Sequence, residues 1–394
     1  MMDKTTLCTA IVVAVIIISM GAVIVYDNSL QDDESSGSTY NLVARVNSEG
    51  SGIYIKDTVL TARGGSSAFF TNNSGYYTVD ESNAAAWGGL IFATPGAATI
   101  QHVQLQSLVE EKMKLGFTLY QEGQSTDNKH VYFVTNIANK AAAEAETHID
   151  GGILWEPQFS AIVENNNGFV ELGLTNNFFP GHTCCVIAGY TSYMQSHPDT
   201  TARFLAAYIK GAEWISDPAN HEELVTLCME KTSGLSRTAI EDALSNITYV
   251  YSDESGDLND LRKDVANLVT GLSPGLKRSI SELGFNSPNQ FASRFVDDSY
   301  LMKALEINSD DSYSYSGSKA SITVACISGD IHQIALHAAV AQGYFAEYGI
   351  NVSISAQSNG PGVATALQNG EAQFGLMGAP PATSTVINGK LVTN

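Results

Sequence analysis

The segment Ser321–Asn394 alternates short apolar strands with short helices, and this pattern constrains the fold more than any other in the sequence. Ile322–Ile327 is a compact apolar run that predicts a buried strand, and apolar residues from Ile331 to Phe345 recur at helical spacing. Strands that alternate with helices this short indicate a parallel sheet, whose ligands bind beyond the carboxyl ends of its strands. Further along, the pattern predicts a strand over Ile350–Ile354, a helix over Gly362–Asn369, a strand over Phe374–Met377 and a turn over Gly378–Pro381.

The longer segment Tyr40–Glu306 begins with strands and helices and ends in helices alone. Strands are predicted over Leu42–Val46, Gly52–Ile55, Leu90–Ala93, Val131–Val134, Gly152–Trp155, Val170–Leu172 and Cys184–Ala188. Helices are predicted over Lys140–His148, Thr200–Trp214, His221–Lys231, Ser236–Asn246 and Leu258–Thr270. We therefore expect a second α/β lobe followed by a helical tail.

Length and charge narrow the class of protein. A chain of 394 residues exceeds what one hydrophobic core usually fills, so two lobes or domains are expected. The formal net charge is −21, from 41 acidic against 20 basic residues. That charge repels nucleic acid and anionic membrane surfaces, so a nucleic-acid-binding role is excluded.

The N-terminus predicts attachment to a membrane. Leu7–Val25 is uncharged and long enough to cross a bilayer as a helix, and Lys4 before it favours a cytoplasmic start. A cleaved signal peptide is the alternative. Two stretches rich in Ser, Asp and Gly are predicted to be flexible linkers. The expected organisation is an anchor or signal over 1–27, a linker over 28–39, a long segment over 40–306, a second linker over 307–320 and the short segment over 321–394.

The five cysteines show no C-x-x-C spacing of the kind that binds zinc. Cys184 and Cys185 are adjacent within a predicted strand. We expect them to fill the strand with one side chain on each face. A metal site or a strained vicinal disulfide is the alternative.

Several stretches resemble one known family. They are ITVACISGDIHQIALHAAVAQGYFAEYGINVSI, NGPGVATALQNGEAQFGLMG and GAPPA in the short segment, and NSEGSGIYI, IFATPGAATIQH, DGGILWEPQFSA and PGHTCCVIAGY in the long one. Together they are similar to the nitrate/sulfonate/taurine-type periplasmic solute-binding proteins, a family related to thiamine-pyrimidine binders. The resemblance implies a two-lobed α/β fold of the type II periplasmic-binding-protein class. Each lobe would be a mainly parallel sheet flanked by helices, and one N-terminal transmembrane helix would precede the lobes.

The order of these stretches departs from the family's order. There, the part that resembles Ser321–Asn394 comes first, and the part that resembles Tyr40–Glu306 follows it. We therefore expect a circular permutant that holds one full set of parts. A fragment of a tandem array and a swapped dimer are the alternatives.

The resemblance implies a ligand between the two lobes. The strongest candidate is the turn Thr94–Gln101, whose small residues let backbone N–H groups approach an anion at the start of a helix. An ordinary strand-to-helix turn is the alternative there, and Asp330 could be a plain helix cap. The candidate contacts are Thr94, Gly96, Ala97, Thr99, Asp330, His332, Gly378, Ala379, Pro380, Asn47, Glu49, Ser51, Trp155, Glu156 and His182.

The implied function is capture of a small anionic solute outside the cell membrane for an ABC importer. The solute would be a sulfonate, nitrate, bicarbonate or a pyrimidine precursor, and the partners would be the ABC permease and the membrane. No cofactor, metal or catalytic residue is expected. One alternative is a ligand-sensing ectodomain that signals through a separate partner. Another is a thiamine-pyrimidine-synthase-like enzyme, whose cysteine-rich motif requires more cysteines than Cys184 and Cys185 supply.

Overall fold

A computed structural model describes residues 40–164, 168–272 and 276–389 of the chain. The predicted anchor Leu7–Val25 and the first linker lie outside these residues. Among the described residues, no helix has both the length and the apolar composition needed to cross a membrane.

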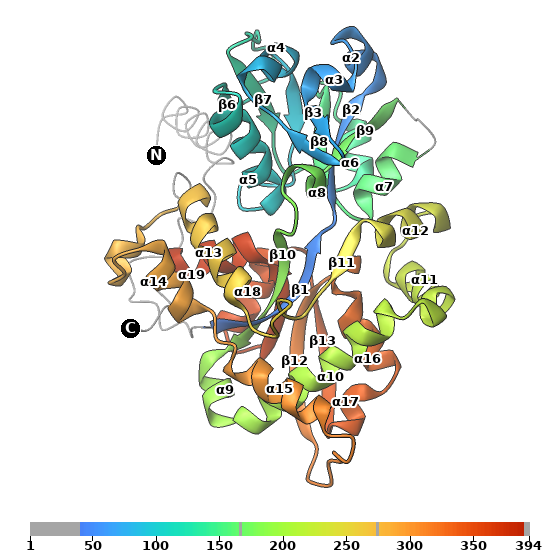
Figure 1. The fold of residues 1–394 in the computed structure, drawn as a ribbon, viewed down its shortest axis with the longest axis vertical. Helices are drawn as coiled ribbons and strands as arrows, with labels where there is room; N and C mark the ends of the chain where they lie inside the picture. The colour runs from blue at the N-terminus through green and yellow to red at the C-terminus, as the bar shows by residue number, and fades with distance from the viewer. Residues whose placement is uncertain (1–39, 165–167, 273–275, 390–394) are drawn as a thin grey trace, which may run out of the picture. The chain divides into compact units, whose positions relative to one another are not determined.

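The described chain folds into two α/β lobes, each built on a six-stranded sheet (Figure 1). The sheet of lobe I has the spatial order β11 (Ile247–Tyr249), β1 (Tyr40–Glu49), β10 (Thr183–Tyr190), β14 (Phe374–Gly378), β12 (Ala320–Ile327) and β13 (Ile350–Gln357). The sheet of lobe II has the order β6 (Gly116–Leu119), β7 (His130–Val134), β5 (Ile91–Ala93), β8 (Gly151–Trp155), β2 (Ser51–Lys56) and β9 (Phe169–Leu174). A small hairpin, β3 (Thr71–Asn73) and β4 (Tyr76–Thr78), belongs to lobe II.

The prediction of mainly parallel sheets is wrong for lobe I. In the described chain, β1 pairs antiparallel with both β10 and β11, and β10 pairs antiparallel with β14. The only parallel pairs in this sheet of the described chain are β12 with β13 and β12 with β14. The reason is that β1 and β10 are the strands by which the chain leaves lobe I and returns to it, so they run in opposite directions. In lobe II the strands β5 to β8 are parallel, as expected, and β2 and β9 are antiparallel additions.

Helices cover the sheets of both lobes. In lobe I they are α9 (Thr191–Ser196), α10 (Pro198–Ser216), α11 (His221–Lys231), α12 (Arg237–Ser245), α13 (Asn259–Leu272), α14 (Pro288–Phe295), α15 (Ser299–Ser309), α16 (Ile334–Ala341), α17 (Tyr344–Glu347), α18 (Gly360–Gln368) and α19 (Ala379–Asn388). In lobe II they are α2 (Asp57–Ala62), α3 (Ser66–Phe69), α4 (Ala84–Trp87), α5 (Ile100–Gln106), α6 (Lys140–Ala145), α7 (Gln158–Val163) and α8 (Thr175–Phe178).

Two helix predictions need correction. The helix expected over Lys140–His148 ends at Ala145, because Glu146 turns to an extended conformation and its carboxylate accepts a hydrogen bond from the His148 N–H. The turn expected over Gly378–Pro381 is the start of α19 instead. Proline suits the first turn of a helix, because its fixed φ is already helical and its missing N–H would have had no partner there.

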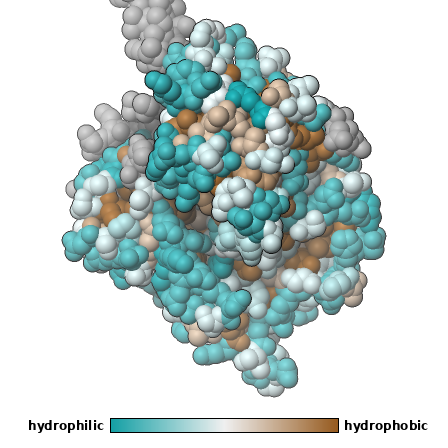
Figure 2. All heavy atoms as spheres, turned by 45° about the horizontal axis from the view of Figure 1, so that its top comes forward, coloured by the Kyte–Doolittle hydropathy of each residue, from teal (hydrophilic) through white to brown (hydrophobic). Residues whose placement is uncertain are grey.

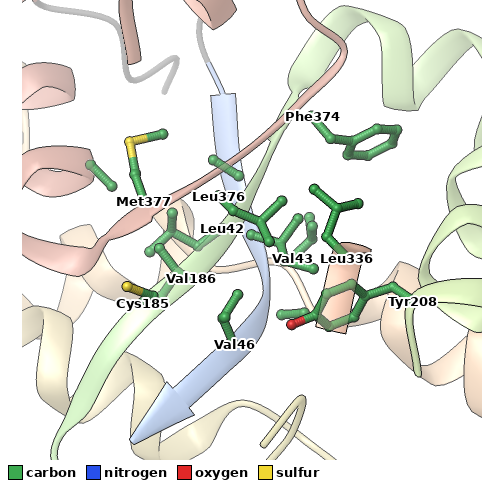
Figure 3. Packing of buried hydrophobic residues seen from close by; sticks show 14 of the residues in the cluster. Leu42, Val43, Val46, Cys185, Val186, Tyr208, Leu336, Phe374, Leu376 and Met377 are labelled. Atoms are coloured by element: carbon green, nitrogen blue, oxygen red, sulfur yellow. The ribbon is translucent and has the colours of Figure 1, made fainter. Parts of the chain in front are cut away.

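The core of lobe I joins segments that are far apart in the sequence. Figure 3 shows Leu42 and Val46 of β1 packed with Val186 of β10, Leu376 of β14 and Tyr208 of α10. The ring of Phe204 in α10 stacks on Phe374 in β14, with the centroids 4.0 Å apart. The short segment thus packs against the helices that follow Ser196. Outside this core, hydrophilic residues predominate on the face shown in Figure 2, with smaller hydrophobic patches between them.

Residues 307–320, expected to form a flexible linker, carry defined contacts. The first three of them complete α15, and the ring of Tyr313 stacks on Tyr348 with centroids 5.6 Å apart. The guanidinium of the buried Arg203 lies 3.9 Å above the centre of the Tyr315 ring.

Candidate functional site

The described chain passes between the lobes at two places, and the first crossover is a single glycine. Gly50 joins β1 to β2 with a φ of +86°, a conformation that favours glycine. A Cβ at this position would lie 2.3 Å from His332 Nε2. The Gly50 carbonyl accepts hydrogen bonds from the Glu156 N–H and from His332 Nε2, both at 2.9 Å. Residues from both lobes therefore donate hydrogen bonds to one carbonyl oxygen at the crossover.

His332 is held as a cation at this crossover. Its Nδ1 lies 2.7 Å from Asp330 Oδ1, and its Nε2 faces the Gly50 carbonyl. Both partners are acceptors, so both ring nitrogens must carry a proton. Burial alone would lower the pKa of His332, but the Asp330 carboxylate, Cys184 and the hydrogen bonds raise that pKa to about 9. Asp330 also caps the turn by accepting from the His332 N–H at 3.0 Å.

Glu156, at the end of β8, is fully buried beside the same carbonyl. Its carboxylate accepts hydrogen bonds from the N–H and hydroxyl of Ser160, both at 3.0 Å, and from Asn246 Nδ2 at 2.8 Å. Asn246 belongs to lobe I, so this bond links the lobes directly. Burial raises the pKa of Glu156, and the three donors and the nearby His332 oppose that shift.

The remaining crossover residues extend this network on either side. Ser51 pairs with Trp155 across β2 and β8, and its hydroxyl accepts from Gln101 Nε2 at 2.8 Å. On the other side, Asn47 accepts from the Cys185 N–H at 3.2 Å and donates to the Glu49 carbonyl at 3.1 Å. The side chains of Asn47, Ser51 and Gln101 are buried and hydrogen-bonded to the protein, which gives them a positioning role.

The second crossover, residues 179–182, lies beside the first. Glu49 donates its N–H to the His182 carbonyl at 3.2 Å and accepts from the Gly181 N–H at 3.0 Å. His182 Nδ1 donates to the Phe179 carbonyl at 2.7 Å. Burial lowers the pKa of His182, so its ring is neutral and its Nε2 is an acceptor. This buried Nε2 has no partner in the described part of the chain.

The turn Thr94–Gln101 connects β5 to α5 at the boundary between the lobes. Thr99 caps α5 by accepting from the His102 N–H at 3.3 Å, and its hydroxyl donates to the Gly96 carbonyl at 2.8 Å. The buried Thr94 hydroxyl lies 3.1 Å from His102 Nδ1. Burial lowers the pKa of His102 to about 4, so this ring is neutral at pH 7.

This turn leaves backbone donors open. Within the described residues, the N–H groups of Ala97, Ala98 and Gln101 have no hydrogen-bond acceptor. The turn also faces lobe I, because Ile100 belongs to the lobe I core. One helical turn further on, Val103 lies close to Gly271 of α13. Backbone N–H groups without an acceptor at the start of a helix can bind an anion. Here they lie at the boundary between the two lobes.

Comparison with known proteins places the chain in a family. Residues 10–229, more than half of the chain, match the NMT1-like family. The chain belongs to the NMT1-like family. Residues 331–393 match a second description, NMT1/THI5 like. The resemblance inferred from the sequence motifs is therefore confirmed.

The fold of this NMT1-like chain is similar to that of a solved structure, the periplasmic nitrate-binding protein NrtA from Synechocystis PCC 6803. The TM-score is 0.51 at 13% sequence identity, and the match covers 74% of this chain and 71% of that chain. The likeness confirms an α/β fold resembling a periplasmic binding protein. No curated protein sequence matches the chain.

The structure of the NMT1-like chain brings most of the sequence-predicted site residues to the two crossovers. Those linked there by hydrogen bonds or strand pairing are Asn47, Glu49, Ser51, Trp155, Glu156, His182, Asp330 and His332. Gly378 joins them through the pairing of β14 with Cys185. The next two residues, Ala379 and Pro380, are buried at the start of α19. Thr94, Gly96, Ala97 and Thr99 lie in the turn that leads to Gln101. Contact of any of these residues with a solute stays a prediction.

Three further residues join these groups: Gly50, Gln101 and Asn246 form bonds between the candidates. Gly50 carries a signal as a glycine between two predicted strands, and Gln101 ends the predicted turn Thr94–Gln101. Asn246 carries no signal in the sequence. The expectation that Cys184 and Cys185 point to opposite faces also needs correction. Their Sγ atoms are only 3.8 Å apart, and the strand is irregular here, with register shifts between β1 and β10.

Within the described ranges, one group could hold a metal, at the surface of lobe I. His221, Glu222 and Glu241 place one ligand atom each within 4.8 Å of the others. Both carboxylates already accept from the Arg237 guanidinium, at 2.8 Å and 2.7 Å, so a metal would have to displace that cation.

Proposed function

We propose that the chain is an extracytoplasmic solute-binding protein that captures a small anionic solute for an ABC importer. The observation that carries the proposal is the set of open N–H groups at Ala97, Ala98 and Gln101, at the boundary between two lobes joined by short crossovers. A ligand bound there would contact both lobes, as expected for a type II periplasmic-binding-protein fold that closes by a hinge. The NrtA likeness supports the same fold, and NrtA itself is a nitrate-binding protein.

The proposal includes the location and the partners. Leu7–Val25 would anchor the chain in the membrane and leave the two lobes outside, where the permease of the importer would receive the solute. The solute would leave unchanged, so the chain would act as a binder without turnover. Nitrate, bicarbonate, sulfonates and pyrimidine precursors are the candidate solutes.

The order of the parts is also a proposal. We propose that residues 40–306 and 321–394 form one complete pair of lobes within a single chain. Support comes from β14, which lies between β10 and β12 in one sheet. Two bonds add to it: the Tyr40 hydroxyl donates to the Ala382 carbonyl at 2.8 Å, and Arg278 Nε donates to the Asn388 carbonyl at 3.1 Å.

A thermal-shift screen of the purified chain against these anions and heterocycles tests the function. A solute at about 100 times its dissociation constant should stabilise the fold by about 2.7 kcal/mol. Ala97→Val should cut that stabilisation to about 1.4 kcal/mol or less by crowding the open N–H groups. Ala85→Val, the same change at an exposed alanine of α4, should leave it intact. Equal shifts in both variants would remove the turn from the site.

A further inference from the structure

Three asparagines begin the tripeptide N-x-S/T, the acceptor pattern for N-linked glycans on exported proteins. They are Asn72 in NNS, Asn246 in NIT and Asn351 in NVS. The pattern alone does not separate them. The structure does, because it shows which amide nitrogens are accessible.

Asn246 is closed to modification. Its Nδ2, the atom that would carry a glycan, donates to the buried Glu156 carboxylate at 2.8 Å. This bond joins lobe I to lobe II at the first crossover. The half-buried side chain holds this nitrogen against a fully buried carboxylate of the other lobe, so we expect no glycan on it in the folded chain.

Asn72 is open at the end of a hairpin. The whole stretch Thr71–Tyr76 is exposed, and it includes Ser74, the hydroxyl residue of the tripeptide. Asn72 Oδ1 accepts from the Gly75 N–H at 2.9 Å, which fixes the side chain. Its Nδ2 makes no hydrogen bond within the described residues. The amide nitrogen Nδ2 of Asn72, which would carry the glycan, is therefore accessible to solvent.

Asn351 is open on an edge strand. It is the second residue of β13, which has β12 as its one neighbour at the end of the lobe I sheet. The side chains of Asn351 and Ser353 are exposed on the same face of the strand, and neither makes a hydrogen bond in the described part of the chain. An exposed sheet edge invites pairing with other chains, and a bulky polar group beside it would block that pairing.

We propose that Asn72 and Asn351 carry N-linked glycans and that Asn246 does not. The inference rests on the extracytoplasmic location in the proposed function. The donor would be a lipid-linked oligosaccharide. The amide nitrogen forms a bond to C1 of the first sugar, the C1–O bond breaks, the lipid phosphate leaves with the electron pair, and the nitrogen gives up one proton. The glycans would cover the lobe II hairpin and the open edge of lobe I.

Peptide mass spectrometry of the full chain from its own cells tests this assignment. Peptides that contain Asn72 and Asn351 should carry a glycan mass, and the Asn246 peptide should be unmodified. Asn72→Gln should remove one glycan, while Asn73→Gln, which changes only the middle residue of the tripeptide and keeps its acceptor, should remove none. Ser353→Ala should remove the second glycan, and Ser353→Thr should keep it.

The outcomes separate this inference from the proposed function. An exported chain that binds anions but is unmodified at Asn72 and Asn351 would overturn the glycan assignment alone, and so would a glycan on Asn246. Modified peptides from a chain that binds no anion would support the assignment and defeat solute binding. A chain retained inside the cell without glycans would defeat both.

Discussion

At the residue scale, the crossover is built around a buried cation. The His332 imidazolium donates to the Asp330 carboxylate and to the Gly50 carbonyl, and Glu156 meets the same carbonyl through its N–H. Breaking a buried charge pair by removing one partner is costly, because the other charge remains without compensation. Loss of the positive charge on His332 should therefore weaken the contact between the two lobes.

This charge predicts a pH-dependent stability. The pKa of His332 rises from 6.5 in the unfolded chain to about 9 in the folded one. Its contribution is thus complete below about pH 6.5 and is lost as the pH rises through about 9. The shift corresponds to about 3 kcal/mol. Asp330, Cys184 and Glu156 are the ionisable groups that act on this ring.

Thermal unfolding from pH 6 to pH 10 measures this effect. The melting temperature of the natural chain should fall between pH 6.5 and 9 more steeply than that of His332→Gln, which keeps one donor but cannot titrate. Parallel curves for the two proteins would show that the imidazolium does not stabilise the crossover.

At the element scale, the turn before α5 depends on Thr99. Its hydroxyl accepts from the His102 N–H and donates to the Gly96 carbonyl, so it fixes both the helix start and the turn. Thr99→Ala should lower the free energy of unfolding by about 1 kcal/mol, the usual effect of losing such a cap. Thr99→Ser keeps the hydroxyl and should restore most of that loss. Denaturant unfolding of the three proteins gives the comparison, and an unaffected Thr99→Ala variant would contradict this role.

The helices and strands of the structure also show which elements can be predicted from the sequence. The helix over His221–Lys231 begins and ends where its apolar spacing indicates. The strands of both sheets lie where their apolar runs predict, except β6 and β11, for which no strand is predicted. The sequence predicts a turn where α19 begins, because prolines break a helix interior, but two prolines suit the first turn of a helix. The short strand β11 was missed because three residues that follow a helix carry too little periodicity.

The sequence predicts which residues form the candidate site, but it does not predict the hydrogen bonds between them. Asp330, His332 and Glu156 were named from the family resemblance, and they do lie together. The bonds that unite them join residues such as His332 and Gly50, which are 282 positions apart. A contact of that span depends on how two lobes pack, and no local pattern carries it.

At the scale of the whole molecule, the two segments complete one another. If the chain is a permutant that closes on itself, a rejoined chain with residues 321–394 placed before residues 40–306 should bind the solute with unchanged affinity, because only connections change. It should also be somewhat less stable, since Arg203 would lose the ring of Tyr315 from the removed linker. Light scattering and titration should show a solute-binding monomer. Obligate oligomers or an inactive aggregate would favour a tandem-array fragment instead.

The central claim is that one small anion binds between the lobes of each chain and is not consumed. Isothermal titration of the purified chain with the anion that gives the largest thermal shift tests it most directly. We expect one site per chain, a solute recovered chemically unchanged, and binding weakened at least tenfold, or by about 1.4 kcal/mol, in Ala97→Val. Conversion of the bound molecule, or no heat of binding with any anion of the panel, would contradict it.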